Sequence, residues 1–261
     1  MSEAPSALLG TLPLLGRIAL ITGAAHNIGR AIALAYAESG ADVVVHAHSS
    51  VDELQRLSAE IQAMGRRSLA CVADVREQAA VQQMAAKAAD ILGPIDVLVN
   101  NAAVRKESAF EDLSIDAWHE ALGVTLDGAF HCTQAVIGGM LALKSGTIVN
   151  LVGLTAHTGA ANRAHVVTAK AGIIGFTRAL AVEYGGRGIT VNGVSPGTID
   201  TVRGVSAGGA APAHRGQRVI PVGRLGHPNE IAAMCVYLAS QQARYITGQI
   251  IEVNGGAHLS G

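Results

Sequence analysis

The sequence predicts a doubly wound α/β fold, in which helices cover both faces of a seven-stranded parallel sheet. Three observations support this prediction. Short runs of β-branched residues alternate along the chain with Ala-rich helical segments. Several of these runs are continuously apolar, such as residues 43–45 (VVV) and 97–99 (VLV), which is typical of parallel strands buried on both faces. The chain has 261 residues, 49% of them hydrophobic and 15% charged, which suits one large globular domain.

Seven strands are expected in chain order, and a helical segment follows each of the first six. Their expected limits are residues 17–22, 42–47, 68–72, 95–100, 147–151, 189–194 and 249–253. Because parallel strands need long crossovers, this alternation favours helices on both sides of the sheet. We expect a single domain over residues 16–261, preceded by an N-terminal tail of residues 1–15.

Composition argues against several classes of partner. The chain carries 19 Lys and Arg against 20 Asp and Glu, and no basic run is longer than Arg66-Arg67, so we expect no nucleic-acid partner. No uninterrupted apolar stretch reaches about 18 residues, and Glu3 stands where a leader would be basic, so we expect a soluble, cytoplasmic protein without a membrane partner. Cys71, Cys132 and Cys235 are far apart in apolar surroundings, which indicates buried free thiols.

The first expected strand runs into a glycine-bearing turn, residues 22–29 (TGAAHNIG), and then into a helix. Gly23 permits the tight turn, and Gly29 lacks a Cβ that would hold the helix away from the cofactor and the sheet. The helix N-terminus favours a pyrophosphate. This arrangement predicts a Rossmann-type dinucleotide site.

Further segments resemble the short-chain dehydrogenase/reductase family, closest in pattern to the β-ketoacyl carrier-protein reductases. They are residues 73–75 (ADV), 96–102 (DVLVNNA), 169–172 (AKAG), 194–197 (VSPG), 223–226 (GRLG) and 246–249 (ITGQ). With the glycine turn, the resemblance covers residues 16–256. It implies an oxidoreductase that acts on a small molecule and assembles as a homo-oligomer, a tetramer in the family.

The glycine turn and the resemblance together indicate which residues hold the cofactor. They are Gly23, Ala25, His26, Asn27, Ile28, Gly29, His48, Ser49, Asp74, Val75, Asn101, Ala102, Ala103, Lys170, Pro196, Gly197, Ile199 and Thr201. At the end of the second strand an acidic residue would bond the ribose 2′-hydroxyl and repel a 2′-phosphate. That position is Ala47, with hydrogen-bond donors nearby, so NADP(H) is expected in preference to NAD(H), which stays an alternative. Neither segment offers the Arg or Lys that is usual for NADP specificity.

The period-2 spacing of His46 and His48 raises the alternative of a metal site. No third ligand follows at metal-binding spacing, so polar residues at the end of a strand are the preferred interpretation and no metal is expected.

The family's catalytic pattern is missing at three of its four positions. In the family, a Tyr with a pKa lowered by a nearby Lys gives the proton, a Ser polarises the carbonyl, and an Asn supports a proton-relay water. Lys170 sets the register of the Tyr-x-x-x-Lys motif, and the corresponding positions hold Val166, Gly153 and Thr125. The family's standard carbonyl mechanism therefore cannot be carried over to this chain.

Lys170 and His165 are the catalytic candidates. His165 titrates in the range of a replacement acid, but on a helix it would point about 100° away from position 166. Residues 202–212 are rich in Gly and Ala where the family carries its substrate lid. Arg203, Arg215 and Arg218 could meet an anionic substrate there.

Three hypotheses follow. The first is an NADP-dependent oxidoreductase with a non-standard active site, which reduces a polarised C=C or C=N bond. Some family members that reduce enoyl thioesters also lack the usual Tyr. The second is a non-catalytic NADP-binding or scaffold subunit, a pseudoenzyme that pairs with an active homologue. The third is non-redox isomerisation or elimination.

Overall fold

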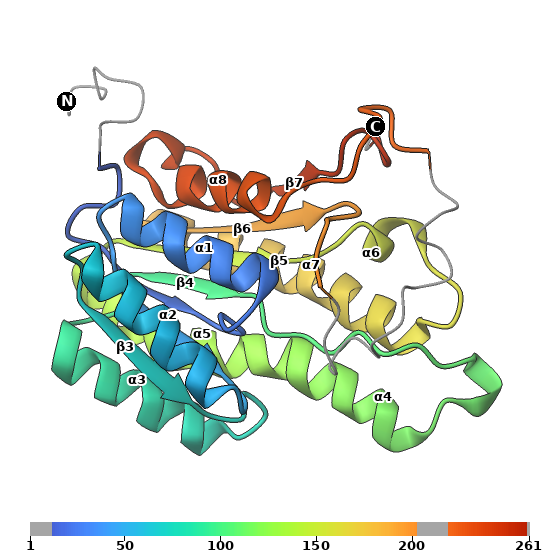
Figure 1. Cartoon of the computed structure of the whole chain (residues 1–261), viewed down its shortest axis with the longest axis horizontal. Helices are drawn as coiled ribbons and strands as arrows, with labels where there is room; N and C mark the ends of the chain where they lie inside the picture. Colours follow the sequence, from blue (N-terminus) through green and yellow to red (C-terminus); the bar gives the residue numbers. More distant parts are fainter. Residues whose placement is uncertain (1–11, 203–218, 260–261) are drawn as a thin grey trace.

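The computed structural model describes residues 12–202 and 219–259, and it confirms the predicted architecture (Figure 1). Seven parallel strands form one sheet in the order β3-β2-β1-β4-β5-β6-β7. They are β1 (Ile18–Ile21), β2 (Asp42–Ala47), β3 (Ser68–Val72), β4 (Val97–Asn100), β5 (Gly146–Leu151), β6 (Ile189–Pro196) and β7 (Ile250–Val253). Each coincides with a strand expected from the sequence.

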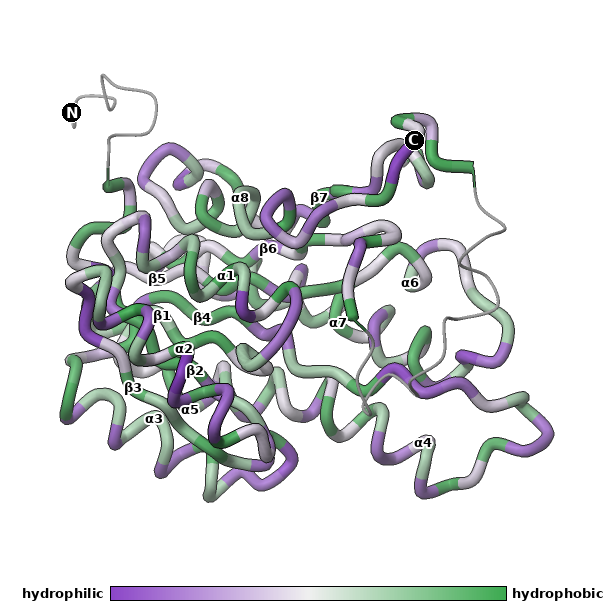
Figure 2. Tube along the Cα trace, in the orientation of Figure 1, coloured by the Kyte–Doolittle hydropathy of each residue, from purple (hydrophilic) through white to green (hydrophobic). Residues whose placement is uncertain are grey.

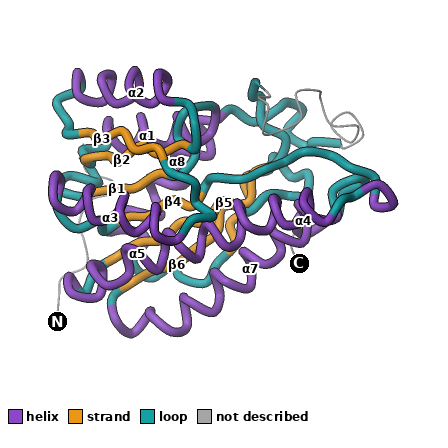
Figure 3. The backbone as a smooth tube through the Cα atoms, turned by 90° about the horizontal axis from the view of Figure 1, so that it is seen from below, coloured by secondary structure: helices purple, strands orange, loops and turns teal. Residues whose placement is uncertain are grey.

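Two layers of helices cover the sheet (Figure 3). One face carries α1 (Asn27–Glu38), α2 (Val51–Ala63) and α8 (Pro228–Ala239), and the other carries α3 (Gln78–Leu92), α5 (Gly128–Leu143) and α7 (Ala164–Tyr184). The shorter helices are α4 (Ile115–Leu122) and α6 (Thr155–Thr158), and 3-10 turns occur at Phe110–Asp112, Gly185–Arg187 and Gln241–Ala243. Gly123–Asp127 forms a π-helical turn between α4 and α5.

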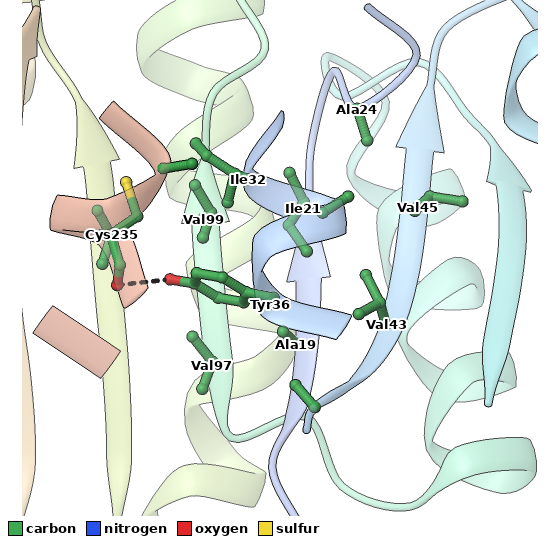
Figure 4. Packing of buried hydrophobic residues seen from close by; sticks show 14 of the residues in the cluster. Ala19, Ile21, Ala24, Ile32, Tyr36, Val43, Val45, Val97, Val99 and Cys235 are labelled. Atoms are coloured by element: carbon green, nitrogen blue, oxygen red, sulfur yellow. Dashed lines mark hydrogen bonds between the residues drawn. The ribbon is translucent and has the colours of Figure 1, made fainter. Parts of the chain in front are cut away.

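A hydrophobic core lies on each face of the sheet. Figure 2 shows mainly hydrophobic strands at the centre, with the strongly hydrophilic segments toward the periphery. Between α1, α8 and the sheet, Tyr36 is fully buried and its hydroxyl donates a hydrogen bond to the Cys235 carbonyl, at 2.9 Å (Figure 4). The three cysteines are buried and unbridged, as predicted.

One residue of the expected N-terminal tail is buried. Most of that tail, residues 1–11, lies outside the described residues. Leu14 is fully buried, and its N–H donates to the Ser39 carbonyl at 2.8 Å. Leu14 therefore packs with the domain, although the Pro and Gly content around it is typical of a tail.

Helix α7, with 21 residues, is the longest helix among the described residues. By length and composition alone, Ala164–Arg187 could cross a membrane. It packs against α4, α6 and β6, however, and buries Lys170 and Thr177. These contacts are those of a core helix in a globular domain.

The strand order reverses between β1 and β4, which are neighbours in the sheet. From β1 the chain winds outward through β2 to β3, and from β4 it winds the opposite way through β5 to β7. In open α/β sheets, ligands bind in the crevice outside the carboxyl ends of the strands at such a point.

Candidate functional site

A cavity of about 940 Å³ opens at this point of the sheet. Its volume lies at the upper end of the range of ligand pockets. Every residue that the sequence predicted to hold the cofactor lines it, together with Gly153 and Val166. The structure thus brings the cofactor candidates, Gly153 and Val166 into one continuous cavity.

The glycine turn after β1 is closely fitted to the end of β4. Gly23 has φ +64°, and a Cβ at Gly29 would clash with the Gly23 carbonyl oxygen and would lie 2.7 Å from Asn101 Nδ2. The same Asn101 Nδ2 donates to the Thr22 and Gly23 carbonyls, both at 2.9 Å. Glycine is therefore required at position 29, where a side chain would displace this amide.

The N-terminus of α1 presents unused donors to the cavity. No side-chain hydrogen bond caps the helix at His26, and its first turn contains no acidic residue. The first N–H groups of a helix lack partners within the helix, and the helix dipole adds positive potential there. Together with the glycine cradle, this end of the cavity fits the pyrophosphate of a dinucleotide.

Asn27 ties the turn to the far wall of the cavity. It is a non-glycine residue at φ +51°, a conformation that Asn tolerates better than most residues. Its Nδ2 donates to the Val202 carbonyl at 2.8 Å, and its Oδ1 accepts from the Val202 N–H at 3.1 Å. The segment after β6 is thereby held to the glycine turn.

His46 has a structural role. It is 1% exposed, its Nδ1 accepts a hydrogen bond from the Gly23 N–H at 3.4 Å, and its Nε2 lies 2.9 Å from the Ala73 carbonyl. Nε2 must therefore carry the proton, and burial lowers the pKa of this imidazole, which keeps it neutral. Both ring nitrogens are thus engaged. Within residues 12–202 and 219–259, no group of three or more His, Cys, Asp or Glu could hold a metal ion.

Two arginines outside the glycine turn and the end of β2, Arg30 and Arg76, line the same cavity as Ala47. Arg76 binds the Asp74 carboxylate through Nε, at 3.0 Å, and through Nη2, at 2.5 Å, and this bonding lowers the pKa of Asp74. Arg30, from α1, pairs with Glu60. The glycine turn and the end of β2 contain no Arg or Lys. The folded chain nevertheless brings two arginines to the cavity, one from α1 and one from the loop before α3.

Lys170 stands at the other end of the cavity. It is 7% exposed, and its Nζ donates a short hydrogen bond to the Leu151 carbonyl at the end of β5. Burial, with a contribution from the nearby charge of Arg105, lowers the pKa of this amine to about 7. Lys170 can therefore both give and take a proton near neutral pH.

The three positions that the sequence matched to the family's Ser, Tyr and Asn differ in their surroundings. Gly153 has φ +132°, and no atom lies within 4 Å of where its Cβ would be. Val166 is buried and lines the cavity one turn before Lys170. Thr125 is buried inside the π-helical turn and is absent from the described lining.

His165, the other catalytic candidate, is 2% exposed and is not one of the described lining residues. Burial lowers its pKa, although a hydrogen bond with the Lys106 backbone acts in the opposite direction. Its Nδ1 has no hydrogen-bond partner among the described residues. The helix geometry thus separates it from Val166, as its place next to that residue in the sequence suggested.

Three further cations line the same end of the cavity: Arg105, Lys106 and Arg163. No motif in the sequence marks them, although Arg163 lies just before the motif containing Lys170. The arginines predicted to meet an anionic substrate, Arg203, Arg215 and Arg218, lie outside the described residues.

Comparison with known proteins identifies relatives of the whole chain. A family model described as Enoyl-(Acyl carrier protein) reductase matches residues 23–258. The (2S)-[(R)-hydroxy(phenyl)methyl]succinyl-CoA dehydrogenase subunit BbsD of Thauera aromatica is 41% identical, over 93% of this chain and 97% of its own. The 3-oxoacyl-[acyl-carrier-protein] reductase FabG of Staphylococcus epidermidis is 38% identical, over 94% of this chain and 100% of its own.

Two solved structures show the same fold, each with a TM-score of 0.87 and 36% identity over 95% of this chain. One, covered to 99%, is described as an NAD(P)-dependent gluconate 5-dehydrogenase of Beutenbergia cavernae with NADP bound at low occupancy. The other, covered to 98%, is described as a short-chain alcohol dehydrogenase of Sinorhizobium meliloti.

Proposed function

The chain belongs to the short-chain dehydrogenase/reductase family, and from this premise we propose that it is an NADP(H)-dependent oxidoreductase with a non-standard active site, which reduces a polarised C=C or C=N bond. The observation that carries the proposal is a buried amine, Lys170, with a pKa of about 7, in the wall of a cavity whose Tyr and Ser positions hold Val166 and Gly153.

The fit to NADP(H) rests on two regions of the cavity, one for the pyrophosphate and one for the 2′-phosphate. The glycine cradle and the uncapped N-terminus of α1 suit the pyrophosphate. Ala47 offers no carboxylate that would repel a 2′-phosphate, and Arg30, Arg76 and His48 line the same cavity. The NADP found in the Beutenbergia cavernae structure supports the same preference.

The choice of reaction follows from where negative charge would develop. A bound NADPH supplies the hydride. In the reduction of a ketone, the charge then appears on the carbonyl oxygen, where the family places hydroxyl donors, and Val166 and Gly153 offer none. In a conjugated C=C bond the charge spreads over an enolate, and in a C=N bond it appears on nitrogen.

Lys170 is the proposed proton donor. As the ammonium, it gives one proton to the enolate carbon or to the nitrogen, its own N–H bond breaks, and the neutral amine keeps the electron pair. The neutral amine is stable in this buried position because its pKa is near 7. His165 is the alternative acid, but it would need a rearrangement to reach the cavity.

A fluorescence titration of the purified protein with NADPH and NADH is the first test. We expect tight binding of NADPH and weaker binding of NADH. Turnover is then measured with an α,β-unsaturated ketone, a cyclic imine and a saturated ketone, and consumption of NADPH is expected only with the first two. Absence of binding to either nucleotide, or reduction of the saturated ketone alone, would contradict the proposal.

A second function is favoured by the loss of three catalytic positions: an NADP-binding subunit without catalysis of its own. The Thauera aromatica relative is named as a subunit of its dehydrogenase, which supports pairing with another chain. This function requires nucleotide binding without turnover by the isolated chain, and activity only in a complex with an active homologue. Co-expression with such a homologue, followed by co-purification and assay, distinguishes it from the first.

We also propose that the protein is cytoplasmic and forms a homotetramer, as the family resemblance implies. Phe130 on α5 and Val182 on α7 are 45% and 87% exposed, so these two helices offer apolar surface for assembly. Light scattering coupled to gel filtration measures the mass directly, and a monomer would contradict the proposal.

A further inference from the structure

Arg163 is a buried cation in the wall of the cavity at its substrate end. Its side chain is 7% exposed, and it immediately precedes the first residue of α7. Arg163, Val166 and Lys170 all line the cavity, and their spacing of three and four residues places them on one face of the helix. The Cα atoms of Arg163 and Lys170 are about 10 Å apart along the helix axis, at 1.5 Å per residue.

The guanidinium of Arg163 is only partly used by the protein. Its Nε donates to Glu107 Oε1 at 3.0 Å. Its Nη2 is buried and has no hydrogen-bond partner among the described residues. A buried guanidinium nitrogen without a partner is costly, so a donor of this kind in a cavity wall indicates a ligand that accepts its hydrogen bond.

The surroundings of Arg163 favour negative charge. Two carboxylates lie near, but each already has a partner: Glu107 binds Arg163, and Glu120 binds Lys106 at 3.0 Å. Arg105 adds another positive charge to the lining. The first turn of α7 contains no acidic residue, and no side chain caps it. The helix dipole therefore acts in the same direction as the arginines.

A purely structural role for Arg163 would use the ion pair with Glu107 alone. That role explains Nε but leaves Nη2 buried and unsatisfied. It also does not explain why the side chain lies in the cavity wall, beside the apolar Val166.

We propose that Arg163 anchors an anionic group of the substrate, a carboxylate, and that the rest of the substrate extends over Val166 toward Lys170. The planar fork of a guanidinium matches the oxygens of a carboxylate. This inference rests on the proposed function for the place of the reacting bond, but binding of the anion needs no turnover. It assigns the substrate to the class of unsaturated organic acids with an apolar body.

The test compares two ligands that differ in charge and hardly in shape, cinnamate and cinnamamide. Calorimetric titration of the full chain, with and without saturating NADPH, measures their dissociation constants. We expect cinnamate to bind about 10-fold more tightly than cinnamamide, since hydrogen bonds to charged groups contribute this much or more. Inorganic phosphate and acetate are each titrated as competitors of cinnamate. If phosphate displaces cinnamate at a lower concentration than acetate does, the assignment to a carboxylate is overturned.

Two variants with opposite expected effects separate binding from folding. Arg163→Gln removes the donor, and cinnamate binding should weaken about 10- to 100-fold. Glu107→Gln removes the carboxylate that competes for Arg163, and binding should strengthen about 3- to 10-fold. The matched control is Arg224→Gln, which breaks an Arg–Glu pair outside this cavity and should change nothing.

The outcomes distinguish the anion site at Arg163 from the proposed NADPH-dependent reduction. Preference for cinnamate, lost in Arg163→Gln and enhanced in Glu107→Gln, supports the anion site even if no substrate is ever reduced. Equal binding of cinnamate and cinnamamide, unchanged binding in Arg163→Gln, or weaker binding in Glu107→Gln would overturn it. If Arg163→Gln does not fold, the ligand pair and Glu107→Gln still decide. Failure of NADPH to bind would instead remove the proposed function and leave the anion titration of the free protein interpretable.

Discussion

The two ends of the cavity differ in how closely their residues are fitted together. At the glycine turn, the backbone and side chains are fitted so closely that Gly29 has no room for a Cβ beside Asn101. At the end of β5, Gly153 has open space around the position of its Cβ, and Val166 lines the cavity without a hydroxyl group. The comparison teaches that a nucleotide site depends on backbone fit, whereas the chemistry depends on a few side chains that can be exchanged while the fold is kept.

The largest effect is expected at the closely fitted end. Gly29→Val should weaken NADPH binding about 100-fold, because the added methyl groups would displace the Asn101 amide and overpack the turn. Fluorescence titration measures this. The control is Gly175→Ala, where no atom lies within 4 Å of the new Cβ. Equal loss of binding in both variants would show that the fit at Gly29 is not the cause.

At the chemical end, Lys170→Met should lower turnover of an unsaturated ketone about 100-fold, the contribution typical of a general acid. Exposed Lys87→Met, in α3, serves as the control. Because the ammonium is the donor and the pKa of Lys170 is about 7, kcat/KM should fall as pH rises through about 7. A flat profile between pH 6 and 8 would exclude Lys170 as the donor.

A smaller effect tests whether the family's chemistry can be restored. Gly153→Ser should destabilise the protein by about 1–3 kcal/mol, because φ +132° strains any residue with a Cβ even in open space. Urea unfolding measures this cost, with Gly175→Ser as the control. With Val166→Tyr and Thr125→Asn added, we still expect no efficient ketone reduction. A stable triple variant that reduces ketones would show that these three side chains alone account for the absence of ketone reduction in the unmodified protein.

The smallest effect is expected at His46, whose ring links the glycine turn at Gly23 to the Ala73 carbonyl after β3. His46 is neutral in the fold and its pKa is lowered, so its contribution to stability is complete above about pH 6.5, the ordinary pKa of His, and is lost as pH falls below it. The slope of unfolding free energy against pH, measured by urea titration between pH 8 and 5, should become flatter in His46→Gln. The control is His119→Gln, at an exposed position in α4.

Much of this molecule could be predicted from its sequence, because continuous apolar runs and glycine positions are local signals. The seven strands and the cofactor candidates around Gly23 and Gly29 are examples.

The remainder depends on contacts that are remote in the sequence. Arg30 and Arg76 reach the nucleotide end from a helix and a loop outside the segments that usually decide NADP specificity. The burial of Arg163 depends on its packing with Glu107, 56 residues away. The conformation of Gly153 and the burial of Leu14 are likewise set by neighbours, and no periodicity in the sequence reports them.

The backbone at Gly153 also limits what protein engineering can do at this end of the cavity. Glycine adopts φ +132° freely, whereas a serine there would be strained and would place its hydroxyl group correctly only if the backbone turned. A redesign that adds a side chain at position 153 therefore has to change the backbone conformation as well. Changes at neighbouring positions with ordinary backbone angles are the simpler route to new chemistry.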